Sequence, residues 1–261
     1  MEAYKLFEKI RQETPIIHLI TNWVTANDSA SVVRALGAYP VVANAREESE
    51  NFTTLSSALV LNIGTLTPHV VEAMKISAVK ANSKGIPVVF DMCGAGATRF
   101  RDKKSSELLN ETRIDVLLGN IREISLVAGR AFRSTKVDPA GNRKKMVDLA
   151  QGVSKERNMT VVLRGSETII IKNNEQFIVK NRADMSKWVV GVNCMITAAV
   201  GAFVAVEKDL ALAAAAAVVC CGVTAEIAAE SSKGPASFKT NFIDQLYNLT
   251  AEDVKKRQRV E

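Results

Sequence analysis

The sequence predicts an α/β fold in which a mainly parallel central sheet is flanked by helices. Two observations carry this prediction. Short apolar runs, typical of buried strands, alternate with amphipathic helical patterns, and polar or glycine-rich residues follow most of the runs. Ligands of such sheets bind beyond the carboxyl ends of the strands, so we expect a site there. No linker, repeat or low-complexity tract divides the chain, and we therefore expect one domain over residues 1–261.

The expected elements follow in order along the chain. The runs expected as parallel strands are Ile16–Ile20, Pro40–Ala43, Ala58–Ile63, Ile86–Phe90 and Ile114–Leu118. Helical patterns such as Val70–Ser83 lie between them, and a loop after Arg130 leads to a helix at Pro139–Arg157. The later strands are expected at Thr160–Leu163, Thr168–Ile171 and Gln176–Val179. The closing helices are expected near Cys194–Val206, Leu210–Ser231 and Phe238–Leu249.

Charge and cysteine usage exclude several classes of protein. The net charge is +6, but the basic residues are scattered and no aromatic residues are interleaved with them, which argues against a nucleic-acid partner. The four cysteines lack zinc-type spacing, and adjacent Cys220 and Cys221 make a poor disulfide pair. With no signal peptide in the sequence, we expect reduced thiols in a cytoplasmic protein.

Two uncharged stretches are long enough to raise the question of a membrane span. Gly191–Asn193 interrupts the first, which runs from Trp188 to Val206, and alanine dominates the second, from Leu210 to Ala225. We therefore expect two buried core helices and no membrane association.

The segment Asp91–Thr98, DMCGAGAT, places a carboxylate at the end of a buried strand and a flexible glycine turn after it. Gly94 and Gly96 would allow backbone amides to approach an anion such as a phosphate. A plain strand–loop–helix turn would have the same sequence. No Gly-Lys-Ser/Thr follows, so this is not a Walker loop.

The segment Gly119–Ile124, GNIREI, follows a strand and opens a helix. Asn120 and Glu123 both fall near the first helical turn. They could serve a metal–phosphate group, which needs hard oxygen ligands, often through water. They could equally form a capping arrangement, with Asn120 as the N-cap and Glu123 at the third helical position.

The segment Gly191–Cys194, GVNC, leads into a long apolar helical pattern. If Asn193 caps that helix, Cys194 lies in its first turn, where free amides and the helix dipole lower the pKa of a thiol. Cys194 could then act as a base or nucleophile. A small buried structural cysteine is the alternative. His18 lies within an apolar strand and is expected to be a hydrogen-bonded core residue.

Together these segments, in this order, resemble the hydroxyethylthiazole kinase family of the ribokinase-like superfamily. The resemblance extends over about residues 15–249, and NIGTL with D-x-x-G-x-G-A-T is its most specific part. The matching text is HLITNWVTAN, ALGAYPVVANAREE, ALVLNIGTLTP, GIPVVFDMCGAGATRFR, DVLLGNIREI, GVNCM and GPASF.

This resemblance implies a three-layer ribokinase-like fold and phosphorylation of the primary alcohol of 5-(2-hydroxyethyl)-4-methylthiazole by ATP with Mg²⁺, a salvage step toward thiamine. It implies a homotrimer with active sites between subunits. It also assigns residues. Cys194 is implied near the reacting hydroxyl. Asp91 and Glu123 are implied around the magnesium–phosphate group, through water. Val42, Gly191 and Asn22 are implied for the substrate, and Asn120, Arg164, Gly165 and Asn193 for the nucleotide phosphates.

The sequence also departs from the family pattern, mostly on the nucleotide side. The usual Thr-Gly-Thr-Gly-Cys is Val190–Cys194 here, so Val192 lacks a hydroxyl and Asn193 replaces a glycine. A usual arginine is Leu118, and a usual Thr-Gly is Arg164-Gly165. We hypothesise that Arg164 partly replaces the missing charge and contacts phosphate. The alternative is a nucleotide site that is no longer used, with Arg164 pointing to solvent. A second hypothesis is a catalytically impaired relative that binds a thiazole-like molecule without efficient phosphoryl transfer.

Overall fold

One eight-stranded sheet organises the chain in the computed structural model, which describes residues 1–129 and 139–261. The strand order is β2-β1-β3-β4-β5-β6-β7-β8, with all pairings from β2 to β6 parallel and the last two antiparallel. The mainly parallel sheet predicted from the sequence is therefore confirmed. The strands are β1 Ile16–Ile20, β2 Tyr39–Val42, β3 Ala58–Asn62, β4 Val88–Asp91, β5 Val116–Asn120, β6 Thr160–Arg164, β7 Thr168–Lys172 and β8 Glu175–Val179.

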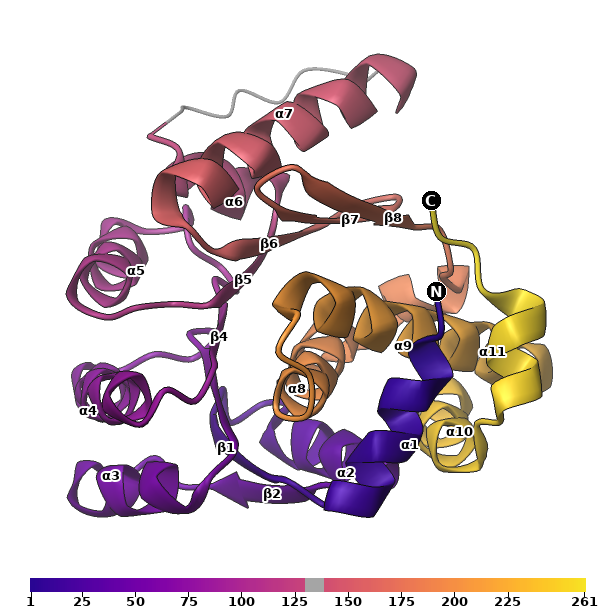
Figure 1. Cartoon of the computed structure of the whole chain (residues 1–261), viewed down its shortest axis with the longest axis horizontal. Helices are drawn as coiled ribbons and strands as arrows, with labels where there is room; N and C mark the ends of the chain where they lie inside the picture. The colour runs from indigo at the N-terminus through magenta and orange to yellow at the C-terminus, as the bar shows by residue number, and fades with distance from the viewer. Residues whose placement is uncertain (130–138) are drawn as a thin grey trace.

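Helices cover both faces of this sheet and make three layers (Figure 1). The helices on one face are α3 Arg46–Leu55, α4 Pro68–Lys84, α5 Arg99–Glu111, α6 Ile121–Val127 and α7 Pro139–Arg157. Those on the other face are α1 Ala3–Glu13, α2 Ala26–Leu36, α8 Val192–Val204, α9 Leu210–Ser231, α10 Pro235–Asn248 and α11 Ala251–Arg257. A short 3₁₀ helix, η1 Asp184–Trp188, precedes α8. The loop expected after Arg130 lies outside the described residues.

The sheet separates two hydrophobic cores, because alternate strand residues point to opposite faces. On β5, for example, Val116 and Leu118 belong to the core under α8 and α9, whereas Leu117 belongs to the core under α4 and α5. Pro40 is tolerated inside β2 because β2 is an edge strand with one neighbour. The N–H that proline lacks is therefore not needed for hydrogen bonds to a strand on the other side.

The two uncharged stretches form the buried helices α8 and α9, as expected. Helix α9 is the one described helix long and apolar enough to cross a membrane, but 78% of its apolar window is buried inside the protein. Small residues let these helices lie close to the sheet. A Cβ added at Gly201 of α8 would come within 2.3 Å of Cγ2 of Val60 on β3.

The order in which strands are added to the sheet reverses at β1, since β2 lies on one side of β1 and β3 on the other. A crevice forms where parallel strands diverge in this way, at their carboxyl ends. The register brings the polar strand ends together there. Asn62 of β3 lies opposite Asp91 of β4, and Asn120 of β5 lies opposite Arg164 of β6. The fold therefore gathers the polar residues that follow the strands at one edge.

Candidate active site

A cavity of about 590 Å³ opens at the carboxyl ends of these strands. Its wall includes the segment after β1, the glycine turn after β4, the end of β6 and the start of α8. Six of the residues singled out from the sequence line this cavity: Asn22, Arg164, Gly165, Gly191, Asn193 and Cys194.

Cys194 lies in the first turn of α8, as the sequence predicted. The helix begins two residues earlier than expected, because Gly191 and not Asn193 is its N-cap. Gly191 has φ +96°, and a Cβ there would come within 2.5 Å of Cγ2 of Thr25, so this position requires glycine. The suggested capping role of Asn193 is therefore wrong. Asn193 is the second residue of the helix and is exposed at the cavity wall.

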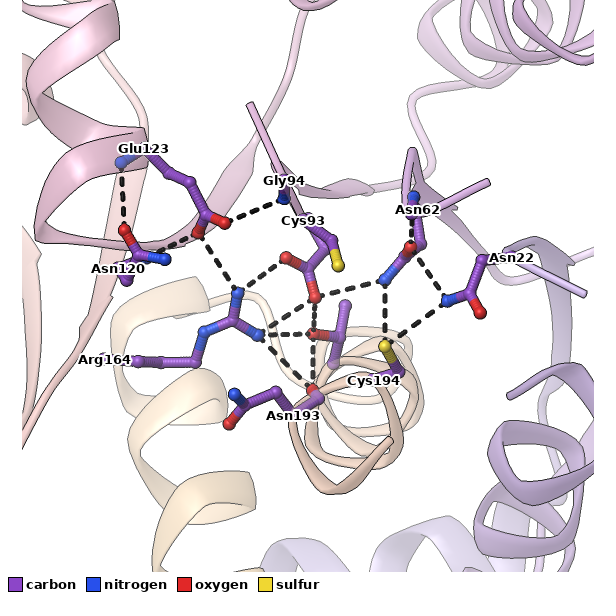
Figure 2. Close-up of polar contacts among 12 residues, drawn as sticks. Asn22, Asn62, Cys93, Gly94, Asn120, Glu123, Arg164, Asn193 and Cys194 are labelled. Atoms are coloured by element: carbon purple, nitrogen blue, oxygen red, sulfur yellow. Dashed lines mark hydrogen bonds and ion pairs between the residues drawn. The ribbon is translucent and has the colours of Figure 1, made fainter. Parts of the chain in front are cut away.

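Polar donors surround the Cys194 sulfur (Figure 2). The side-chain amides of Asn22 and Asn62 each donate to it at 3.4 Å. Hydrogen bonds from the thiol of Cys93, and then from Thr25 and Asn22, lower the pKa of Cys194 to about 6 despite burial and the nearby charge of Asp91. The same interaction with Cys194 raises the pKa of Cys93.

Cys194 thus differs from a structural cysteine. Cys220 and Cys221 of α9 are also buried, and that burial raises the pKa of both. Cys194 is only 8% exposed, but its lowered pKa favours the thiolate at neutral pH, and it lies at the positive end of a helix whose N-cap makes no side-chain hydrogen bond. A thiolate facing a cavity can accept the proton of an alcohol.

Asp91, the last residue of β4, is held by a dense network of hydrogen bonds. The guanidinium of Arg164 binds it as a fork, with Nη2 at 2.6 Å from Oδ1 and Nη1 at 3.0 Å from Oδ2. The Thr197 hydroxyl and the Asn62 amide donate to the same Oδ2 at 2.7 and 3.2 Å. Asp91 is fully buried, so this pairing offsets the cost of keeping a carboxylate out of water.

Glu123 lies on the other side of the same guanidinium. Its Oε2 is 3.7 Å from Nη2 of Arg164. The capping box suggested by the sequence is present, because Asn120 Oδ1 accepts the Glu123 amide at 3.1 Å and Glu123 Oε2 accepts the Asn120 amide at 2.7 Å. Glu123 Oε1 also accepts the Gly94 amide at 2.9 Å, which holds the glycine turn against α6. Burial raises the pKa of Glu123 although Arg164 opposes it.

These contacts decide which metal chemistry the residues fit. In the part of the chain that the structure describes, no three His, Cys, Asp or Glu side chains gather as a metal site. The guanidinium of Arg164 lies between the two carboxylates, with Nη2 at 2.6 Å from Asp91 Oδ1 and 3.7 Å from Glu123 Oε2, and so takes the place of a metal ion there. Direct coordination of Mg²⁺ by the two carboxylates therefore does not fit this arrangement. A contact through water stays a prediction.

Two positions that the family pattern connects with ligand binding do not line this cavity. Val42 ends the edge strand β2, is 42% exposed, and does not line the cavity. Leu118 is fully buried in the core under α8 and α9. The position that carries an arginine in the family pattern therefore holds a hydrophobic core residue here. Arg164 does not take up a free position in its place, because its guanidinium is directed at Asp91. Its contact with nucleotide phosphates stays a prediction.

Three further residues of this site were not singled out from the sequence. Asn62 connects Cys194 to Asp91, Cys93 pairs with Cys194, and Thr197 connects Asp91 to α8. Asn62 had a signal, since it is the polar residue at the end of an otherwise apolar strand run. Thr197 had a weaker one, because it lies three residues after Cys194 and so on the same face of the helix.

Comparison with known proteins identifies the family. The model of the hydroxyethylthiazole kinase family matches residues 7–252. The chain is 43% identical to a hydroxyethylthiazole kinase of Desulfatibacillum aliphaticivorans, over 98% of this chain and 96% of that one. A solved structure of hydroxyethylthiazole kinase from Pyrococcus horikoshii OT3 superposes with a TM-score of 0.91 at 35% identity, covering 99% and 98% of the two chains.

A more distant structure shares the fold alone. A ribokinase-like superfamily protein from Enterococcus faecalis V583 matches with a TM-score of 0.62 at 12% identity, over 95% of each chain. The predicted ribokinase-like fold is confirmed by this likeness and by the sheet described above. The extent and identity of the closer matches show that the chain belongs to the hydroxyethylthiazole kinase family.

Proposed function

We propose that this protein transfers the γ-phosphoryl group of ATP to the primary hydroxyl of 5-(2-hydroxyethyl)-4-methylthiazole, a salvage step toward thiamine. Family membership supports this reaction, and the environment of Cys194 carries it in the structure. The low-pKa thiolate accepts the hydroxyl proton while the alcohol oxygen bonds to the γ-phosphorus, and the bond to ADP breaks. The alternative of a binding protein without efficient transfer is not favoured.

The remaining residue roles are part of the same proposal. Asn22 and Gly191 lie beside Cys194 and would position the thiazole alcohol. Asn193, Gly165 and Arg164 line the neighbouring wall, where phosphate oxygens would meet the first turn of α8. Asn120 caps α6 with its side-chain oxygen, which leaves its amide group to donate to the nucleotide.

We propose that Mg²⁺ arrives with ATP and neutralises phosphate charge, and that Asp91 and Glu123 reach it only through water. We also propose a homotrimer in which Val42, exposed on the edge strand, contributes to a neighbouring subunit's substrate site. In this proposal residues 1–261 act as one domain, and the enzyme works in the cytoplasm. Light scattering tests the trimer, and a monomer mass at micromolar concentration contradicts it.

A kinase assay with ATP and the thiazole alcohol tests the central proposal. Cys194→Ala should lower turnover more than it weakens thiazole affinity, because proton removal matters most in the transition state. Cys220→Ala is the matched control, since this buried cysteine of α9 is outside the cavity wall and should leave turnover unchanged. Equal turnover in wild type and Cys194→Ala would return Cys194 to a structural role. Failure of the wild type to phosphorylate the alcohol would refute the function.

A further inference from the structure

We propose that Arg164 is a resident counter-cation, which occupies the place between Asp91 and Glu123 in the free protein and keeps divalent metal ions out until nucleotide binds. The inference deepens the proposed function and rests on it only in naming the nucleotide as the metal's carrier. Its basis is the position of a single guanidinium between two buried carboxylates.

The geometry of Arg164 is that of an ion held in a site. Its two terminal nitrogens reach separate oxygens of Asp91 at 2.6 and 3.0 Å, which is the bidentate arrangement of a strong ion pair. Nη2 also lies 3.7 Å from Glu123 Oε2 (Figure 2). The side chain is 12% exposed, against 0% for Asp91 and 7% for Glu123. One cation therefore serves two carboxylates in a place with little access to water.

The surrounding residues hold the guanidinium in that place. Nη1 donates to the Asn193 carbonyl and the Thr197 hydroxyl, each at 3.4 Å, so the arginine is also fixed to the first turn of α8. Burial alone would lower the pKa of Arg164, but the charge and hydrogen bonds of Asp91, together with the charge of Glu123, outweigh it and the pKa is raised. Arg164 is therefore permanently charged and cannot be neutralised to admit a metal.

A divalent ion entering this place meets two obstacles. The guanidinium occupies the space next to both Asp91 oxygens and Glu123 Oε2, where the ion would have to lie. A metal bound to these oxygens would also lie within a few ångströms of a fixed positive charge, and repulsion at that range in a partly buried site weakens binding by well over about tenfold. A metal carried by phosphate oxygens avoids both obstacles, because its ligands come with the nucleotide.

Replacement of Arg164 should uncover a metal site that the wild type lacks. The probe is Mn²⁺ alone, titrated into the protein without nucleotide or alcohol and followed by the electron paramagnetic resonance signal of free Mn²⁺. We expect no binding by the wild type up to about 1 mM, the weak end of protein–cation sites. We expect Arg164→Thr to bind Mn²⁺ at least about tenfold more tightly.

Two further variants separate charge from other effects. Arg164→Lys keeps a positive charge and should resemble the wild type. Arg113→Thr is the matched control. Arg113 Nε lies 3.1 Å from Asp115 Oδ1 at the opposite, amino-terminal ends of the strands, so its removal should not create Mn²⁺ binding. Far-UV circular dichroism establishes that each variant is folded.

The outcomes are distinct. Equal Mn²⁺ affinity in wild type and Arg164→Thr overturns the inference, and so does a folded Arg164→Thr that binds no Mn²⁺. If Arg164→Thr does not fold, wild type and Arg164→Lys decide, and micromolar Mn²⁺ binding by either overturns the inference. None of these measurements contains ATP or the thiazole alcohol, so a failed kinase assay would refute the proposed function without affecting this result.

Discussion

Removal of the Cys93 thiol should raise the pKa of Cys194. The hydrogen bond from Cys93 is the largest of the interactions that hold this pKa at about 6, and the contacts from Thr25 and Asn22 remain when it is lost. Burial and the charge of Asp91, which both raise this pKa, are larger than the contributions of Thr25 and Asn22, so we expect the pKa of Cys194 in Cys93→Ala to lie at or above the value of about 8.5 of an unperturbed thiol. At pH 7 the thiolate fraction would fall from about 90% to about 3% or less.

The assay is the pH dependence of alkylation by iodoacetamide, with the modified cysteine identified by mass spectrometry. The midpoint of the profile is the readout, because a thiolate of higher pKa is also intrinsically more nucleophilic and the rate at one pH mixes the two effects. The wild-type midpoint at Cys194 should lie near 6 and move upward in Cys93→Ala. The acid limb of the pH profile of kcat/KM should move in the same direction.

Cys220→Ala controls for the loss of a cysteine as such, because Cys220 lies in α9 away from the cavity wall. Its alkylation midpoint at Cys194 should equal that of the wild type. Identical midpoints in wild type and Cys93→Ala would refute the reasoning, since the pKa of Cys194 would then not depend on its cysteine neighbour.

Three further predictions concern stability. Arg164→Met should lower the free energy of unfolding by about 3–5 kcal/mol, because it leaves buried Asp91 without its charge partner; this corresponds to a fall in Tm of about 6–20 °C in a thermal melt, and an unchanged Tm contradicts it. Burial lowers the pKa of His18, whose ring nitrogens bond Thr53 and a backbone carbonyl. Below about pH 6.5 the unfolded state binds more protons than the folded state, so the free energy of unfolding should decrease as the pH is lowered, by at most about 1.4 kcal/mol per pH unit. Urea unfolding of His18→Gln at several pH values should show a smaller dependence of this free energy on pH. Gly191→Ala should cost about 1–3 kcal/mol because its φ is +96°, and an unchanged urea midpoint would show that α8 begins differently.

The fold class could be predicted from the pattern of hydrophobic residues along the chain. Strand and helix periods differ, and the apolar runs of the inner strands are buried on both faces of the sheet, so the pattern of hydrophobic residues located the eight described strands. Helix ends were less certain. Helix α9 begins and ends where the sequence predicted, but α8 begins at Val192 because of the backbone conformation of Gly191, which a pattern of side chains does not encode.

The sequence also placed polar residues at the strand ends, and this determined where the site lies. Their roles in it depended on neighbours far away in the chain. Asn120 and Glu123 are local, and their capping box could be proposed from spacing alone. The pairing of Asp91 with Arg164 joins residues 73 positions apart. Only the register of β4, β5 and β6 brings them together.

The chemistry of Cys194 shows the same division. Its position in the first turn of a helix followed from the sequence, and that position favours a thiolate. The polar side chains around its sulfur come from three other segments: Asn22 and Thr25 after β1, Asn62 at the end of β3 and Cys93 after β4. Contacts between such distant segments depend on strand order and on how closely α8 packs on the sheet, so the tertiary structure alone decided that this cysteine is polarised while Cys220 is not.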